Sequence, residues 1–335
     1  MTILEKAGED RPGGAGLQVD AGFFDRTKTA KLLRKLTSGG KKSIQLWSHL
    51  ESNLRREVQS YSGVDFRFHT RVEAVGQDDS TAWVVTDTGE IIFGDILIGA
   101  DGHRSMVREQ VAPQKPNATF SGYMVWFAAV DEKELPASKR PGDHVPEFTM
   151  LDGINGGFFF GSVFNKGKGS SGSGRRRIGS TFYDNTRNDL LRRLGCVKGS
   201  VVHHSLKGAD IPEETLDKLS EQARAKWPEP WVSATLHAIR TRNLTGIPIK
   251  EYVPDDLVKE RIALIGDAAH VPAPITASGF NESLQDAAEL GKCVAKGIKG
   301  EAAVKALDKY ESLRLNKVRQ MVQSGKSFSY SYGRS

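Results

Sequence analysis

Residues 261–286 hold the side chains best suited to bind a ligand. The apolar run at 262–265 has the composition of a buried strand, and Asp267 follows it closely. After a proline-rich turn, Ser278 and Gly279 begin a helical pattern. Ligands of open α/β sheets bind at the carboxyl ends of strands. A carboxylate at that place can hold sugar-like hydroxyls, and a helix N-terminus aimed at the same crevice stabilises negative charge.

A second strand, turn and helix occupy residues 95–108. Asp101 and Gly102 follow the apolar run, and Gly102 permits close approach of the backbone to a ligand. Arg108 either faces a phosphate or forms a structural salt bridge, and the sequence leaves both possibilities open. Near the start of the chain, Glu5 ends another short strand. An acidic residue at that point of a dinucleotide-binding βαβ unit accepts hydrogen bonds from the ribose.

Two groups of predicted helices and strands must position these residues. In the first third of the chain, short strands and amphipathic helices are expected, with a helix at 46–58 and strands at 64–68, 71–75, 82–85 and 91–93. From residue 120 onward, aromatic-rich runs predict the antiparallel sheet of a second domain. Helices are expected there at 184–194 and 213–226, and a strand at 235–240. Candidate pocket walls are Tyr123, Trp126, Phe160 and Tyr183, although aromatic residues on strands are more often core.

Composition narrows the class of protein. A chain of 335 residues holds about two domains, and 38% hydrophobic and 26% charged residues are ordinary for a soluble globular protein. The net charge of +6 is spread along the chain, so nucleic-acid binding is not expected. No apolar run has the length of a membrane span, and a cytoplasmic location is expected.

No metal site is expected either. Cys196 and Cys293 are too few for a metal cluster or a disulfide framework. His203 and His204 are adjacent, so on a strand they face opposite ways and cannot form a metal pair.

Both ligand-binding stretches resemble motifs of one family. Gly266-Asp-Ala-Ala-His270 with its proline and glycine turn resembles the second flavin motif of the para-hydroxybenzoate-hydroxylase-type monooxygenases. Residues 101–108 fill every position of that family's Asp-Gly motif. One departure is Ala277, where the family usually has glycine. The order of aromatic and proline residues between 122 and 231 resembles the 2,6-dihydroxypyridine 3-monooxygenase-like branch.

The resemblance implies an α/β fold, with a Rossmann-like FAD-binding domain and an inserted antiparallel-sheet substrate domain. The implied FAD-binding domain covers 1–114 and 241–298, the substrate domain 115–240, and a C-terminal helix and tail 299–335. The implied cofactor is FAD and the implied co-substrate is NAD(P)H. The implied flavin-site residues are Glu5, Gln45, Asp101, Gly102, Asp267, Pro274, Gly279, Phe280 and Asn281.

The family's activity is hydroxylation of a small phenolic or hydroxypyridine-like ring with O2, through a flavin C4a-hydroperoxide. No catalytic residue is identified in this sequence. The family's Gly-x-Gly-x-x-Gly unit should precede Glu5, and this sequence begins directly at the second strand, so a truncated FAD-binding domain is expected.

Two alternatives remain. The chain could be a catalytically incompetent remnant acting as a binding protein. Otherwise, it could be another flavin oxidoreductase, a reductase or a halogenase, although the halogenase element Trp-x-Trp-x-Ile-Pro is missing. The oligomeric state stays open, with a homodimer as one option.

Overall fold

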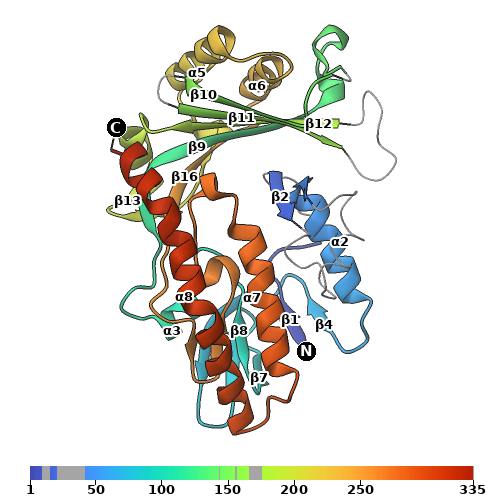
Figure 1. The fold of residues 1–335 in the computed structure, drawn as a ribbon, viewed down its shortest axis with the longest axis vertical. Helices are drawn as coiled ribbons and strands as arrows, with labels where there is room; N and C mark the ends of the chain where they lie inside the picture. Colours follow the sequence, from blue (N-terminus) through green and yellow to red (C-terminus); the bar gives the residue numbers. More distant parts are fainter. Residues whose placement is uncertain (10–15, 21–41, 143, 155–156, 166–175, 335) are drawn as a thin grey trace.

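The computed structural model describes residues 1–9, 16–20, 42–142, 144–154, 157–165 and 176–334. Within these residues the chain forms a mixed helix and sheet fold in two parts, with a large antiparallel sheet at one end (Figure 1). No described helix is long and apolar enough to cross a membrane. The expected α/β class with an antiparallel second sheet is confirmed.

Two parallel strand pairs and several antiparallel ones form the first part. The central pair is β8, Leu97–Gly99, beside β18, Ile262–Leu264, with Gly99 opposite Leu264. All three β18 side chains are fully buried, as expected for a strand covered on both faces. The remaining strands of this part are β1 (Thr2–Leu4), β2 (Gly16–Asp20), β3 (Lys42–Leu46), β4 (Asp65–Arg67), β5 (Val72–Gln77), β6 (Ala82–Thr86), β7 (Ile91–Gly94) and β17 (Val258–Lys259).

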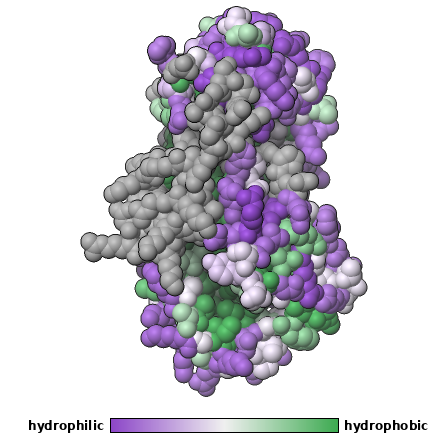
Figure 2. Space-filling model, turned by 90° about the vertical axis from the view of Figure 1, so that its right-hand side faces the viewer, coloured by the Kyte–Doolittle hydropathy of each residue, from purple (hydrophilic) through white to green (hydrophobic). Residues whose placement is uncertain are grey.

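Helices and short turns connect and cover these strands. The helices are α2 (Trp47–Gln59), α3 (Val107–Val111), α7 (Gly279–Val294) and α8 (Glu301–Tyr332), with 3-10 turns η5 (Gly266–Ala268) and η6 (Pro274–Thr276). The expected helix at 46–58 and the four expected short strands are therefore confirmed. On one side of the molecule, hydrophobic residues gather at the end that carries β1, β4 and β7 (Figure 2). Two exposed side chains of β7, Ile91 and Phe93, belong to that end.

An eight-stranded sheet forms the second part, and its longest strand, β9, pairs with β12, β14 and β16. Its strands are β9 (Thr119–Asp131), β10 (Phe148–Ile154), β11 (Gly157–Asn165), β12 (Arg176–Asp184), β13 (Val197–Lys198), β14 (Val201–Val202), β15 (Leu206–Lys207) and β16 (Leu244–Glu251). The sheet therefore extends past residue 240. Its flanking helices and turns are α4 (Asn188–Arg193), α5 (Glu213–Lys226), α6 (Trp231–Arg240), η2 (Glu132–Glu134), η3 (Ala137–Lys139) and η4 (Gly208–Asp210).

The two faces of this sheet have different neighbours. Helices α5 and α6 cover one face, and the C-terminal end of α8 reaches the other (Figure 1). The strand expected at 235–240 is wrong, because α6 occupies these residues. Its buried side chains, Trp231, Ala234, Thr235, Ala238 and Ile239, recur every three or four residues and pack against the sheet.

Candidate functional site

Two loops leave the parallel sheet side by side. Because β8 and β18 are parallel and in register, their carboxyl ends meet at one edge, and the Ile265 N–H donates to the Gly99 carbonyl at 3.0 Å. Asp101 stands just after β8 and Asp267 just after β18. The two stretches that the sequence singled out are thus brought together, as the position of parallel strand ends requires.

Arg108 joins the two loops. Its side chain is fully buried and donates from Nε to the Ala268 carbonyl and from an NH2 nitrogen to the Asp267 carbonyl, each at 2.7 Å. It also donates to the carbonyls of His103 at 3.2 Å and Pro116 at 3.1 Å. Of the two possibilities left open by the sequence, the salt bridge is wrong: within the described part of the chain, Arg108 binds four backbone carbonyls and no carboxylate.

The Asp101 carboxylate is engaged with its own loop. Its Oδ2 accepts from the backbone N–H of Met106 at 2.8 Å and of Val107 at 3.3 Å, at the start of α3. Gly102 adopts a φ of +78°, where a side chain would be strained, although a Cβ there would meet no atom within 4 Å. Gly102 is therefore needed for its backbone conformation, and the space beside it is open.

The Asp267 carboxylate is not engaged. It is exposed to solvent and has no hydrogen-bond or ion-pair partner in the described part of the chain. Protein atoms nevertheless surround it densely, and this desolvation raises its pKa, while His270, Lys250 and Arg108 act in the opposite direction. A desolvated carboxylate that accepts no hydrogen bond from the described residues is suited to a ligand that offers hydroxyl donors.

Positive charge lies beside these loops. Lys250 is half-buried, and desolvation, followed by repulsion from Arg104, lowers its pKa to about 8, with Asp267 opposing the shift. Desolvation and then the charges of Lys250 and Arg104 lower the pKa of His103 to about 3, so His103 is neutral at neutral pH. Neither Lys250 nor Arg104 has a side-chain partner among the described residues. The site therefore carries positive side chains that form no ion pair within the described residues, and these would favour an anion.

The N-terminus of α7 follows the proline turn. Ser278 precedes the helix without capping it, because its hydroxyl contacts Thr276 Oγ1 at 2.7 Å. Pro274 opens η6, and Gly279 is the first residue of the 16-residue helix α7, which also contains Asn281. Ala277 adopts a φ of +49°, which accounts for glycine at this position in the related family.

The three remaining predicted flavin contacts are Phe280, Glu5 and Gln45. Phe280 packs edge-on against Trp47 with ring centroids 6.0 Å apart, within a small cluster that joins α7 to α2. Glu5 directly follows β1, and its Oε1 accepts from the Ala7 N–H at 2.8 Å. Gln45 lies in β3 opposite Leu17, and its side chain is outside the described residues.

Three of the four candidate aromatic residues share one sheet face. Tyr183 lies 5.8 Å from Tyr123 and 5.5 Å from Phe160, measured between ring centroids. Trp126 points to the opposite face, where its Nε1 donates to Asp184 at 2.9 Å. The prediction that Trp126 lines the same pocket is therefore wrong, because it is three residues from Tyr123 and a strand alternates its faces.

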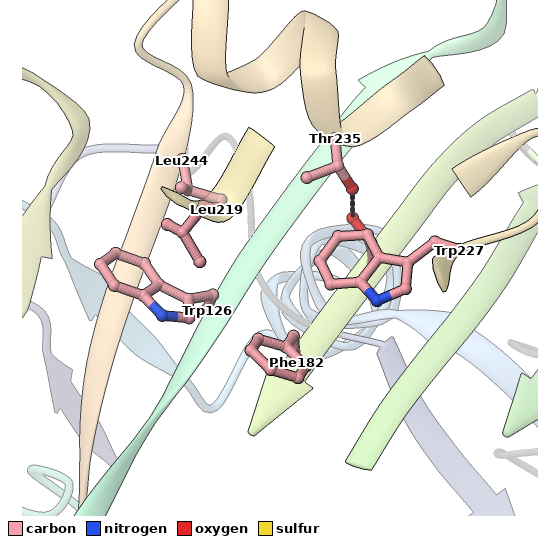
Figure 3. Close-up of a pocket in the computed structure, with 7 residues that line it drawn as sticks. Trp126, Phe182, Leu219, Trp227, Thr235 and Leu244 are labelled. Carbon is pink, nitrogen blue, oxygen red and sulfur yellow. Dashed lines mark hydrogen bonds between the residues drawn. The ribbon is translucent and has the colours of Figure 1, made fainter. Parts of the chain in front are cut away.

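A cavity beside Trp126 lies between the sheet and α5 and α6 (Figure 3). Its volume is only about 10 Å³, close to the minimum for a single water. Ser180 and Thr235 hydrogen-bond across it at 2.8 Å. It is a packing gap, and it cannot hold a substrate. Its lining residues are Trp126, Ser180, Phe182, Leu219, Trp227, Thr235 and Leu244.

Sequence reasoning missed a buried charged cluster behind the Asp267 loop. Asp286 accepts from Arg314 Nε at 2.7 Å, and all three of Asp286, Arg314 and His270 are almost fully buried. A signal was available: Arg314 stands four residues after Tyr310 and four before Val318, on the apolar stripe of α8. A charged residue on such a stripe needs a buried partner.

Comparison with known proteins gives a consistent result. Residues 3–325 match the family model described as FAD binding domain. The 3-hydroxybenzoate 6-hydroxylase of Klebsiella oxytoca is 27% identical over 282 residues, which cover 82% of this chain and 59% of the relative. An FAD-dependent urate hydroxylase of Klebsiella pneumoniae is 28% identical over 81% of this chain and 61% of its own length. This chain therefore spans about three-fifths of these curated relatives.

Solved structures share the fold. The 2,6-dihydroxypyridine-3-hydroxylase of Arthrobacter nicotinovorans has a TM-score of 0.75 at 18% identity, covering 99% of this chain and 86% of that one. Klebsiella pneumoniae HpxO, solved with FAD and uric acid, has a TM-score of 0.65 at 20% identity, covering 99% and 82%. At such identities the likeness shows the fold alone.

Proposed function

The chain belongs to the FAD binding domain family, and from that premise we propose that it is a monooxygenase that hydroxylates a small phenolic or hydroxypyridine-like ring. FAD is the cofactor of this family, and NAD(P)H and O2 are the proposed co-substrates. The observation that carries the proposal is the Asp267 carboxylate, which has no hydrogen-bond partner among the described residues and lies near the positive charge of Lys250. A ligand that combines hydroxyl donors with phosphate anions would satisfy both.

The residues present fit FAD. Asp267 would accept from ribityl hydroxyls, and Lys250 and Arg104 would balance the diphosphate charge. The N-terminus of α7 at Gly279 would stabilise negative charge on the flavin ring, because backbone N–H groups and the helix dipole favour anions. The open space beside Gly102 leaves room for a bound group.

Bound FAD would supply the reduction and oxygen chemistry, and this chain would position the reactants and exclude water. The aromatic face formed by Tyr123, Phe160 and Tyr183 is the proposed substrate side of the large sheet. Burial raises the pKa of Tyr123 to about 12, so its hydroxyl stays neutral and can donate or accept a hydrogen bond. The relatives named above act on hydroxybenzoate and urate, which supports a flat, oxygen-bearing ring as substrate.

The test begins with flavin. The protein is titrated with FAD, and binding is followed by quenching of flavin fluorescence. The oxidation of NADH and of NADPH is then recorded in the presence of a panel of candidate substrates. The panel holds 3-hydroxybenzoate, 2,6-dihydroxypyridine and urate, with benzoate as the non-hydroxylated control. We expect FAD binding, and reductant oxidation stimulated by at least one hydroxylated ring, with one oxygen atom from O2 in the product.

Two outcomes would contradict the proposal in different ways. Protein that binds no FAD would support the alternative of a binding protein without catalysis. Protein that binds FAD and oxidises NAD(P)H, but whose rate no aromatic ring changes, would instead support another flavin oxidoreductase.

A further inference from the structure

A buried carboxylate lies directly behind the Asp267 loop. Asp286, on α7, is fully buried, and its Oδ2 accepts from the Gly266 N–H at 2.9 Å and from His270 Nε2 at 2.8 Å. Its Oδ1 accepts from Arg314 Nε at 2.7 Å. Asp286 therefore links both ends of the sequence 266–270 to α7 and α8, without contacting the candidate site itself.

The hydrogen bond from the Gly266 N–H to Asp286 fixes the backbone next to Asp267. Gly266 adopts a φ of +59° and immediately precedes Asp267, so its N–H fixes the backbone from which the Asp267 carboxylate projects. A Cβ at Gly266 would lie 3.0 Å from Ser283 Oγ, which shows how closely this loop is held against α7. Small changes in this backbone would move the carboxylate. Such a displacement would weaken ligand binding, because binding groups tolerate little displacement.

Asp286 also holds the His270 ring. The fully buried ring carries a proton on Nε2 when it donates to Asp286, and its Nδ1 has no partner among the described residues. Arg314 supplies the compensating charge and is itself shared with Glu282, at 2.6 Å. The cluster thus has one donor arrangement that satisfies the carboxylate.

We propose that Asp286 is a positioning residue for the flavin: by holding Gly266 and His270, it places the Asp267 carboxylate against the ribityl chain. The inference rests on the proposed function, because it assigns Asp286 a role in binding the FAD of that same site. It predicts that FAD affinity depends on a residue that touches no part of the cofactor.

The hydrogen-bond pattern supplies a discriminating variant. In Asp286→Asn, either orientation of the amide directs its NH2 group at a donor, namely Arg314 Nε on one side or the Gly266 N–H on the other. Adding Arg314→Gln replaces that donor with an amide whose oxygen can accept from the new NH2 group. The double variant therefore restores the acceptor for Gly266 and His270, although both charges are gone.

A matched control exists in the large sheet. Glu132 is also a fully buried carboxylate that accepts from three N–H groups, the backbone N, Nε and NH2 of Arg176, at 3.2, 3.2 and 2.9 Å. It lies in η2, directly after β9, where it binds the first residue of β12, in the other part of the molecule from the Asp267 loop. Glu132→Gln should reduce stability as Asp286→Asn does and should leave the flavin site intact.

The experiment measures the Kd for FAD by fluorescence quenching and the unfolding midpoint in urea for all four proteins. We expect Asp286→Asn to weaken FAD binding on the order of tenfold or more. Glu132→Gln should bind within about twofold of the parent protein, and the double variant should recover most of the lost affinity. If Asp286→Asn does not fold, Asp286→Glu keeps the charge but displaces the carboxylate by one methylene, and it should also bind FAD more weakly.

The outcomes separate the two proposals. Parent protein that binds no FAD overturns the proposed function and this inference with it. Parent protein that binds FAD, with Asp286→Asn or Asp286→Glu binding equally well, overturns only the positioning role. Loss of affinity in Glu132→Gln, or no recovery in the double variant, would make the effect a general consequence of lost stability, and would also overturn it.

Discussion

Asp101 and Asp267 stand at the ends of neighbouring parallel strands, each next to a glycine, and the fold treats them differently. One oxygen of Asp101 accepts two backbone N–H groups at the start of α3, whereas neither oxygen of Asp267 has a hydrogen-bond partner among the residues that the structure describes. The reason is chain distance. Helix α3 begins six residues after Asp101, but α7 begins twelve residues after Asp267. A carboxylate at a strand end is free for a ligand only when no nearby helix start takes it.

The largest effect should come from Arg108, which holds both loops together. Arg108→Met would leave four backbone carbonyls, one buried and three partly buried, without their donor, and we expect a loss of about 3 kcal/mol or more in the free energy of unfolding. Urea unfolding measures this. Arg67→Met, which breaks exposed ion pairs with Asp65 and Glu90, is the control and should change stability by about 0.5 kcal/mol or less. Equal losses in both variants would contradict the bridging role.

Asp267→Asn tests the open carboxylate. It should weaken FAD binding about 10- to 100-fold, because hydrogen bonds to a charged acceptor are lost. The free energy of unfolding should change by only about 0.5 kcal/mol, since this carboxylate accepts no hydrogen bond from any described residue. A titration of flavin fluorescence and a urea curve on the same preparation provide both values. An unchanged FAD affinity would remove Asp267 from the site.

Asp101 should show the reverse pattern. Asp101→Ala removes the acceptor for Met106 and Val107, and we expect a loss of about 1 kcal/mol in stability with a smaller effect on FAD affinity than Asp267→Asn. Asp101→Asn keeps an acceptor oxygen and should stay close to the parent protein. If Asp101→Ala weakened FAD binding as much as Asp267→Asn and left the free energy of unfolding unchanged, the contrast between the two carboxylates would disappear.

The smallest effect concerns Lys250. Its lowered pKa of about 8 means that the positive charge is present below that pH and is lost as the pH rises through it. FAD binding should therefore weaken a few-fold between about pH 7 and about pH 9, where the diphosphate keeps its charge. In Lys250→Met, binding should be weaker at the lower pH and nearly flat across the range. A parent protein with a flat profile would show that Lys250 does not neutralise the ligand.

Local patterns predicted much of the fold. The apolar run and proline turn around Asp267 form β18, η5, η6 and α7 as expected, and the aromatic runs from residue 120 form the antiparallel sheet. The strand expected at 235–240 failed because a short amphipathic helix covering a sheet also shows an apolar alternation. The same tertiary contact that buries Trp231 decides between the two.

The site was less predictable, because its decisive contacts are long-range. Arg108 binds carbonyls 159 and 160 residues away, and no local pattern reports such a pairing. The error over Trp126 was avoidable, since residues 123 and 126 of one strand must face opposite ways. The role of Asp286 requires α8 to be placed first, and only the packed structure provides that.

Helix α8 couples the unfolding of the two parts of the molecule. At 32 residues it is about 48 Å long, and it contributes Tyr310 and Val318 to the core of the parallel-strand part and Tyr332 to the aromatic face of the large sheet. Between them Gly325 packs against Ala273 and Thr276, where a Cβ would lie 3.0 Å from each. Neither part can release the helix without exposing apolar surface of the other. Heating should therefore melt both parts in a single cooperative step, and calorimetry should record one peak instead of two.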